Sequence, residues 1–189
     1  GDVYKRQVKE TTHILKEQKE ESERKAITDE LTGVFNRRFF ETKLEDELKL
    51  AKRFRNKLSL IMFDVDHFKQ INDTYGHTIG DVILQEITEV VKGKLSSIDF
   101  LCRYGGEEFA IILPERNIEK AIDIGEKIRK AVEEHAFYGG DTLIPVKISL
   151  GIAEYPSHAL IKEELIKKAD EALYMAKRDG RNNTKIAIK

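Results

Sequence analysis

The stretch DFLCRYGGEEFAIILP, residues 99–114, places an apolar segment on each side of the glycine pair Gly105–Gly106. Two such segments joined by paired glycines predict a β-hairpin, because tight hairpin turns require positive φ angles that glycine adopts freely. The adjacent acids Glu107 and Glu108 follow the turn directly. A surface turn explains the glycines and one acid, but not two carboxylates at the start of an apolar strand.

A second apolar run, LSLIMFDVD at residues 58–66, also ends in acids. Asp64 and Asp66 are two residues apart, so on a strand both side chains leave the same face. Carboxylates concentrated beside a core are costly unless positive charge offsets them. An all-oxygen site of this kind favours Mg²⁺ or Mn²⁺, with the carbonyl of Val65 as a further ligand.

The hairpin is expected to bring its acids toward this strand. Adjacent residues of a regular strand face opposite ways, so only one of Glu107 and Glu108 would meet Asp64, unless a distortion at the glycine turn lets both approach. Glycines there would also let backbone N–H groups come close to a polyphosphate. No GxxxxGK[ST] or GxGxxG pattern is present, so a nucleotide site must be of another kind.

The remaining chain alternates helical and strand patterns. This order, with one hairpin in the middle, predicts an α/β sandwich with a mixed sheet covered by helices rather than a parallel barrel. Helices are expected at about 37–53, 67–76, 80–95, 117–135 and 161–180, and further strands at 144–156 and 183–189.

Residues 1–27 are polar and form a separate segment ahead of the folded domain at 28–189. They carry a weak heptad pattern with charged flanks. The pattern fits a coiled-coil stalk that pairs two chains, and it fits equally a solvated single helix. Its seam positions are Val8, Thr11, Leu15, Gln18 and Ser22.

Composition excludes several classes of partner. The 33 Lys and Arg residues nearly balance the 34 Asp and Glu residues, giving a net charge of -1, so no basic field exists to hold nucleic acid or an anionic membrane. No apolar run approaches the roughly 20 residues of a membrane helix. A single cysteine, Cys102, suits a reducing compartment. We therefore expect a soluble, cytoplasmic domain, whose parent protein could be membrane-anchored.

A second polar group surrounds the acids. An amide and a carboxylate, such as Asn72 and Asp81, suit the edge of guanine, which offers an acceptor oxygen and two donors. Asp81 is also favoured at a helix start by the dipole alone. Lys177 and Arg181 either offset the negative end of the dipole of the last helix or bind a phosphate.

These residues carry a family resemblance. RYGGEEF, residues 103–109, resembles the signature of the GGDEF family, the diguanylate cyclases, in its GGEEF form. The blocks that resemble the family's flanking motifs, in the same order, are DELTGVFNRRFF, FDVDHFKQINDTYGHTIGD, ISLGIAEYP and ADEALYMAKRDGRN. The resemblance covers about residues 28–188. It implies a fold like the palm of adenylyl cyclases and polymerases: a central, mainly antiparallel sheet flanked by helices.

The resemblance also implies a reaction, the condensation of two GTP molecules into cyclic di-GMP with release of two pyrophosphates. Mg²⁺ or Mn²⁺ would be held by Asp64, the Val65 carbonyl and Glu107, with Glu107 also the favoured general base and Glu108 a weaker catalytic candidate. The positions that match substrate contacts are Asn72 and Asp81 for guanine, Phe68 and His77 near base and ribose, Lys69, Lys177 and Arg181 for phosphate, and Gly105 and Gly106 for the open turn.

By the same resemblance one chain binds one GTP, so a homodimer is part of the mechanism, with the stalk coupling it to an upstream sensor domain. One departure stands out: the family's RxxD product-inhibition element reads SSID here, with Asp99 kept and Ser96 in place of arginine. A serine hydroxyl cannot bind a guanine edge and a phosphate together as a guanidinium does, so weak or absent feedback inhibition is expected. The alternative function is a catalytically degenerate domain that binds GTP or cyclic di-GMP and regulates something else.

Overall fold

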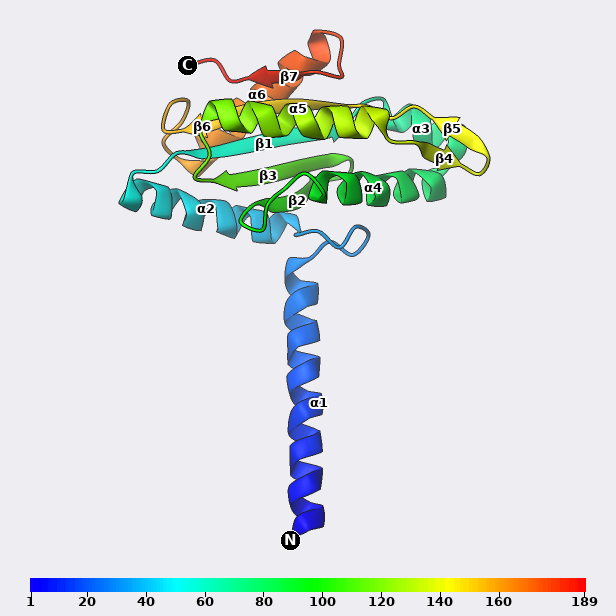
Figure 1. The fold of residues 1–189 in the computed structure, drawn as a ribbon, viewed down its shortest axis with the longest axis vertical. Helices are drawn as coiled ribbons and strands as arrows, with labels where there is room; N and C mark the ends of the chain where they lie inside the picture. Colours follow the sequence, from blue (N-terminus) through cyan, green and yellow to red (C-terminus); the bar gives the residue numbers. More distant parts are fainter.

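The computed structural model describes residues 1–189, as a long N-terminal helix followed by a layered α/β domain (Figure 1). The elements in chain order are α1 (Asp2–Ile27), α2 (Arg37–Phe54), β1 (Leu58–Val65), α3 (Phe68–Tyr75), α4 (His77–Lys92), β2 (Phe100–Gly105), β3 (Glu108–Pro114), α5 (Ile118–Glu134), β4 (Phe137–Gly139), β5 (Thr142–Ile144), β6 (Ile148–Tyr155), α6 (Lys162–Arg178) and β7 (Thr184–Ile186).

The central sheet has five strands in the order β2-β3-β1-β6-β7. Three of its four pairings are antiparallel, and only β6 and β7 run parallel. The predicted fold class, a mixed and mainly antiparallel sheet flanked by helices, is confirmed. In this order the hairpin β2–β3 lies directly beside β1, and Asp64 of β1 is paired in register with Glu108 of β3 and Ser149 of β6.

Strand β1 is buried along its whole length because helices cover both faces of the sheet. Alternate side chains divide between two cores, as a strand's two-residue period requires. Ile61 and Phe63 join the core with α3, α4 and α5, whereas Leu60 and Met62 join the core with α2 and α6. The end of β1 that carries the acids is therefore held rigidly between two helical layers.

Most helix boundaries follow the local signals in the sequence. The expected apolar positions Phe40, Leu44, Leu48 and Ala51 form the buried face of α2. The side chain of Asn117 caps α5 by accepting a hydrogen bond from the N–H of Lys120, at 3.0 Å. Local signals therefore place the helices that flank the sheet.

Two expectations about elements were wrong. The helix expected from residue 80 begins at His77, because Gly76 (φ 92°) ends α3 and the next helix starts at once. The strand expected over 144–156 begins only at Ile148, and β5 pairs with β4 in a small separate hairpin that was not predicted. Pro145 lies between β5 and β6, where it has no N–H to donate to a ladder.

Helix α1 stands away from the domain, and none of its residues is buried (Figure 1). A short bridge between Thr28 and Phe35 marks its junction with the domain, and Phe35 in turn bridges Cys102 on the edge strand β2. In no helix is there a stretch with both the length and the apolar character needed to cross a membrane.

Candidate active site

Acidic side chains meet at the end of β1. The Asp64 side chain is 11% exposed, and one of its oxygens is paired with Nζ of Lys177 from α6. The other oxygen, Oδ1, is buried without a hydrogen-bond partner. Burying a carboxylate oxygen without a partner costs free energy unless a cation or a hydrogen-bond donor interacts with it.

The glycine turn brings the hairpin acids to Asp64. The pairing of β2 with β3 shifts register between Arg103 and Gly105, which is the distortion that would let both acids approach. The N–H of Val65 donates to the carbonyl of Glu107 at 3.3 Å, so the turn is tied to the end of β1. Glu107 repels the charge on Asp64, and Asp64 in turn repels the charge on Glu108.

The pKa values reflect this crowding. Burial raises the pKa of Asp64, the hydrogen bond and charge of Lys177 partly oppose that rise, and repulsion from Asp66 and Glu107 adds to it. Burial and the neighbouring Asp170 of α6 raise the pKa of Glu108 to about 7. A single lysine therefore offsets only part of the negative charge at this end of the sheet.

The donor set fits a hard divalent cation. No group of three or more His, Cys, Asp and Glu side chains is placed to hold a metal ion by itself. The predicted ligands are two carboxylates, Asp64 and Glu107, and the carbonyl of Val65, which leaves positions for water and substrate phosphates, as Mg²⁺ sites usually do. Such an ion would be coordinated by Asp64 Oδ1, the buried oxygen that has no hydrogen-bond partner in the protein.

Asp66 has a different role from Asp64. Its Oδ1 accepts a hydrogen bond from Ser149 Oγ at 2.6 Å, and its Oδ2 accepts one from the N–H of Asn182 at 2.9 Å. Both oxygens are thus occupied within the protein. Asp66 anchors the loop that follows α6.

The predicted guanine contacts lie where α3 meets α4. The Asn72 side chain crosses directly over Gly80, and its Oδ1 is buried without a partner. Phe68 packs beside it, with its ring 3.2 Å from where a Cβ on Gly80 would lie. His77 and Asp81 are exposed on the first turns of α4. An unpartnered buried amide oxygen beside an exposed carboxylate is consistent with a hydrogen-bonding ligand at this crevice.

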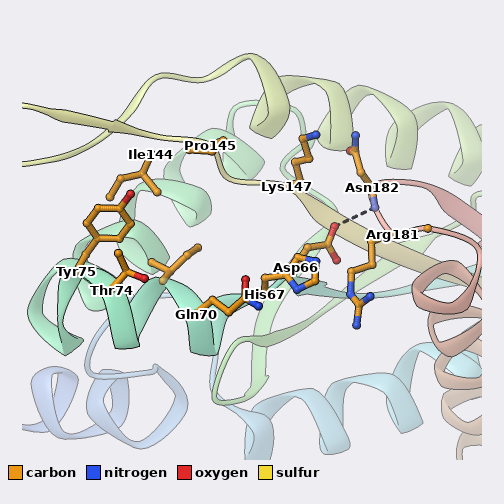
Figure 2. Close-up of a pocket in the computed structure, with 12 residues that line it drawn as sticks. Asp66, His67, Gln70, Thr74, Tyr75, Ile144, Pro145, Lys147, Arg181 and Asn182 are labelled. Carbon is orange, nitrogen blue, oxygen red and sulfur yellow. Dashed lines mark hydrogen bonds between the residues drawn. The ribbon is translucent and has the colours of Figure 1, made fainter.

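The predicted phosphate contacts separate into two groups. Lys177 lies with the acids, and Arg181 lines a cavity of about 430 Å³ between α3, the β5–β6 connection and the loop after α6 (Figure 2). Asp66 and His67 also line that cavity. Lys69 is exposed on α3. It is neither paired with the acids nor among the residues that line the cavity.

Asp99 lies outside this site, in the turn before β2. Its side chain is 1% exposed. Its Oδ2 accepts hydrogen bonds from the N–H of Ser96 at 2.8 Å and from Ser96 Oγ at 3.0 Å. Arg116 Nη2 donates a hydrogen bond to Ser96 Oγ at 3.3 Å and lies 3.9 Å from Asp99 Oδ1, which is buried without a hydrogen-bond partner.

Sequence reasoning missed several residues that support the site. Ser149, Asn182 and Asp170 contact or face the predicted acids, yet none was singled out. Ser149 is a polar residue inside the apolar strand KISLGIA, and this break in the pattern was the one local signal available.

A helix-covered, mainly antiparallel sheet with carboxylates beside a lysine at the end of its central strand matches the palm-like fold expected for a nucleotidyl cyclase domain. The chain belongs to the family described as "Diguanylate cyclase, GGDEF domain", whose family model matches residues 26–183. The resemblance drawn from the sequence is therefore confirmed.

Relatives and solved structures agree with this assignment. The chain is 39% identical over 178 residues to Response regulator PleD of Caulobacter vibrioides, covering 93% of this chain and 39% of that protein. It is 41% identical over 177 residues to Diguanylate cyclase DosC of Escherichia coli, covering 92% and 38%. It therefore spans about two fifths of the length of these relatives. The coiled coil and GGDEF domain of DgcB from Caulobacter crescentus, solved in complex with c-di-GMP, matches with a TM-score of 0.87 and 31% identity over 99% of this chain and 100% of that one.

Proposed function

We propose that this domain condenses two GTP molecules into cyclic di-GMP and releases two pyrophosphates, with Mg²⁺ or Mn²⁺ as cofactor. The observation that carries the proposal is the crowded end of β1, where Asp64 has one oxygen on Lys177 and one without a partner, next to two glutamates. Family membership supports the same reaction. Because GTP is the proposed substrate, the proposed place of action is the cytoplasm.

Each part of the site has a proposed role. Asp64, the Val65 carbonyl and Glu107 would hold the metal ion. When bound, the ion would activate the ribose 3′-hydroxyl as a nucleophile and neutralise phosphate charge. Glu107 is also the candidate to accept the 3′-hydroxyl proton, with Glu108 as the weaker candidate. Gly105 and Gly106 keep backbone groups of the turn accessible to the nucleotide.

Substrate binding is assigned to residues on both sides of the acids. Asn72 and Asp81 would read the guanine edge, with Phe68 and His77 beside base and ribose. Lys177 and Arg181 would bind the phosphates, where charge-assisted contacts are strong. Lys69 would also contact phosphate, by its position in the motif, although it is not among the residues that line the cavity.

The active unit is proposed to be a homodimer. One chain offers one guanine crevice, so the two GTP molecules must be presented by two facing domains. Residues 1–27 are the proposed linker that brings them together, and 28–189 are the proposed catalytic domain. An upstream sensor in the parent protein would act through the linker, as the greater length of the relatives suggests.

The test is incubation of the full chain with GTP and Mg²⁺ or Mn²⁺, followed by identification of the product by mass spectrometry. Wild type should yield cyclic di-GMP, and Glu107→Gln should lower kcat by about 100-fold or more, since proton transfer and charge neutralisation both depend on this carboxylate. Glu89→Gln, an exposed change on α4, is the matched control. Tight GTP binding without any product would instead support the degenerate regulatory domain.

A further inference from the structure

The loop that carries Arg181 has an unusual backbone. Gly180, Arg181 and Asn182 have consecutive positive φ angles of 101°, 61° and 44°. Residues other than glycine adopt this region at a cost of about 1 kcal/mol or more, and asparagine tolerates it best. Such a run persists only where surrounding contacts hold it in place.

Asn182 makes those contacts in two directions. Its backbone N–H donates to Asp66 Oδ2 at 2.9 Å and to Ser149 Oγ at 3.1 Å, which ties the loop to the end of β1 and to β6. Its side chain reaches α5: Nδ2 donates to Glu133 Oε2 at 2.5 Å, and Oδ1 accepts from Arg129 Nη1 at 3.1 Å. A side-chain amide can donate and accept at the same time in this way.

Arg181 is left free by the same arrangement. Its backbone N–H caps α6 by donating to the carbonyl of Ala176 at 3.0 Å, but its guanidinium makes no hydrogen bond or ion pair within the chain and is exposed. Figure 2 shows the side chains of Arg181 and Asn182 leaving the loop in opposite directions, and the dashed bond joins Asn182 to Asp66.

We infer that Asn182, clamped to Arg129 and Glu133, is a positioning residue that aims Arg181 at the substrate phosphates. This inference rests on the proposed function only in that it takes Arg181 as a phosphate contact. A guanidinium on a loose loop must lose conformational entropy each time it binds, whereas a fixed loop presents it ready for contact. The clamp also links α5 to the substrate site through Arg129 and Glu133.

The test compares GTP binding and turnover in a set of variants. Asn182→Gly keeps the left-handed backbone and its N–H but removes the amide clamp, so the KM and the Kd for GTP should rise about tenfold with a smaller change in kcat, as for loss of a contact made in both ground and transition state. Arg181→Ala should show at least as large a rise. The double variant should be no worse than Arg181→Ala alone, because Asn182 acts through that arginine.

A reciprocal exchange provides the rescue. Asn182→Asp places a carboxylate against Glu133 and should weaken GTP binding, whereas Asn182→Asp with Glu133→Gln restores one donor and one acceptor and should recover most of the affinity. Asp123→Asn, which breaks an exposed ion pair with Lys127 elsewhere on α5, is the matched control and should leave the KM unchanged. Melting temperatures of all variants separate loss of positioning from loss of fold.

The outcomes are distinguishable. Additive losses in the double variant, or an exchange that restores the melting temperature but not the affinity, would overturn the positioning role. An unchanged Kd in Arg181→Ala would also overturn it. Failure of wild type to make cyclic di-GMP contradicts the proposed function alone, because the Kd series for GTP still measures the coupling between Asn182 and Arg181.

Discussion

Gly80 lies beneath the Asn72 side chain at the proposed guanine crevice. A Cβ at this position would overlap Asn72 Oδ1 and lie 3.2 Å from the Phe68 ring. We therefore expect Gly80→Ala to displace the amide and weaken GTP binding by about 10-fold or more, the range for loss of a buried hydrogen bond. The fold should tolerate the change, since alanine favours the interior of α4. Calorimetric titration with GTP measures the effect.

The control for this variant is Gly93→Ala at the end of the same helix, where an added Cβ comes no closer than 3.4 Å to any neighbour and φ is -63°. It should bind GTP as wild type does. If Gly80→Ala also binds as wild type, Asn72 does not read the base.

The second residue-scale prediction concerns feedback. Asp99 Oδ2 already accepts two hydrogen bonds from Ser96, and the side chain is nearly fully buried, its unpartnered Oδ1 included, so Asp99 cannot meet a guanine edge without opening this turn. We expect added cyclic di-GMP at micromolar concentration to leave the initial rate of pyrophosphate release unchanged. Inhibition at submicromolar product would contradict this expectation.

At the scale of elements, β6 and α6 pack backbone against backbone at Gly151. A Cβ on Gly151 would overlap the carbonyl O of Ala169 and the backbone N of Leu173, and backbone cannot move aside as a side chain can. Gly151→Ala should therefore push α6 off the sheet and lower the unfolding free energy by about 3 kcal/mol or more. Urea denaturation measures this, and turnover should fall too because Lys177 lies on α6.

Gly125→Ala provides the comparison, because its added Cβ would meet only side-chain ends, those of Ile152 at 3.3 Å, Leu150 at 3.6 Å and Thr184 at 3.7 Å. Gly125→Ala should lower the unfolding free energy much less than Gly151→Ala does. Equal losses in the two variants would show that α6 is not closely fixed against β6.

Glu154, at the end of β6, links that strand to the start of α5. It accepts hydrogen bonds from the N–H of Ile118 at 2.6 Å and from the hydroxyl of Ser157, and Lys57 Nζ lies 3.6 Å away. Burial acts to raise its pKa, but the bonds from Ser157 and Ile118 and the charge of Lys57 together lower that pKa below the usual value for glutamate. The folded state therefore favours the carboxylate over its protonated form.

The sign of the pH dependence follows from this lowered pKa. The stabilisation is complete above the unfolded pKa, at about 4.3 for glutamate, and is lost as the pH falls through the lower folded pKa. Glu154→Gln should lower the unfolding free energy by about 1–3 kcal/mol at pH 7, and the difference from wild type should shrink below about pH 4. Urea denaturation from pH 7 to pH 3 tests this, with exposed Glu134→Gln as control; a gap independent of pH would contradict the assignment.

The elements that sequence predicted best are those with local signals. Gly76 and Asn117 mark helix ends, and Gly105–Gly106 marks the hairpin, through the backbone of a few neighbouring residues. Contacts between distant polar groups carry no such signal: Asn182 and Asp66 are separated by 116 residues, and Asn182 and Glu133 by 49. The acids themselves were found because they break an apolar pattern, whereas the separate roles of Asp64 and Asp66 depend on which side chains face each of them.

At the scale of the whole molecule, the domain builds both its cores without α1. The apolar side chains on that helix have no partner in the chain: Val8 is 47% exposed and Leu15 60% exposed. Ion pairs at i,i+4 spacing, such as Lys19 with Glu23, stabilise the helix on its own only slightly. A second copy of α1 packed along the seam would bury these side chains and bring two catalytic domains together.

Removing residues 1–27 should therefore leave the melting temperature within a few degrees of wild type but lower turnover at submicromolar protein. The reason is effective concentration: a paired stalk holds the two domains near each other, whereas free domains must meet by diffusion, so specific activity should rise with protein concentration. Leu15→Asp in the full chain should act in the same direction by placing a charge on the seam, and Lys9→Gln, off the seam, should not. Analytical ultracentrifugation and turnover over a concentration series measure both effects. A stalk that is only a solvated helix would make Leu15→Asp and Lys9→Gln behave alike and leave specific activity independent of concentration.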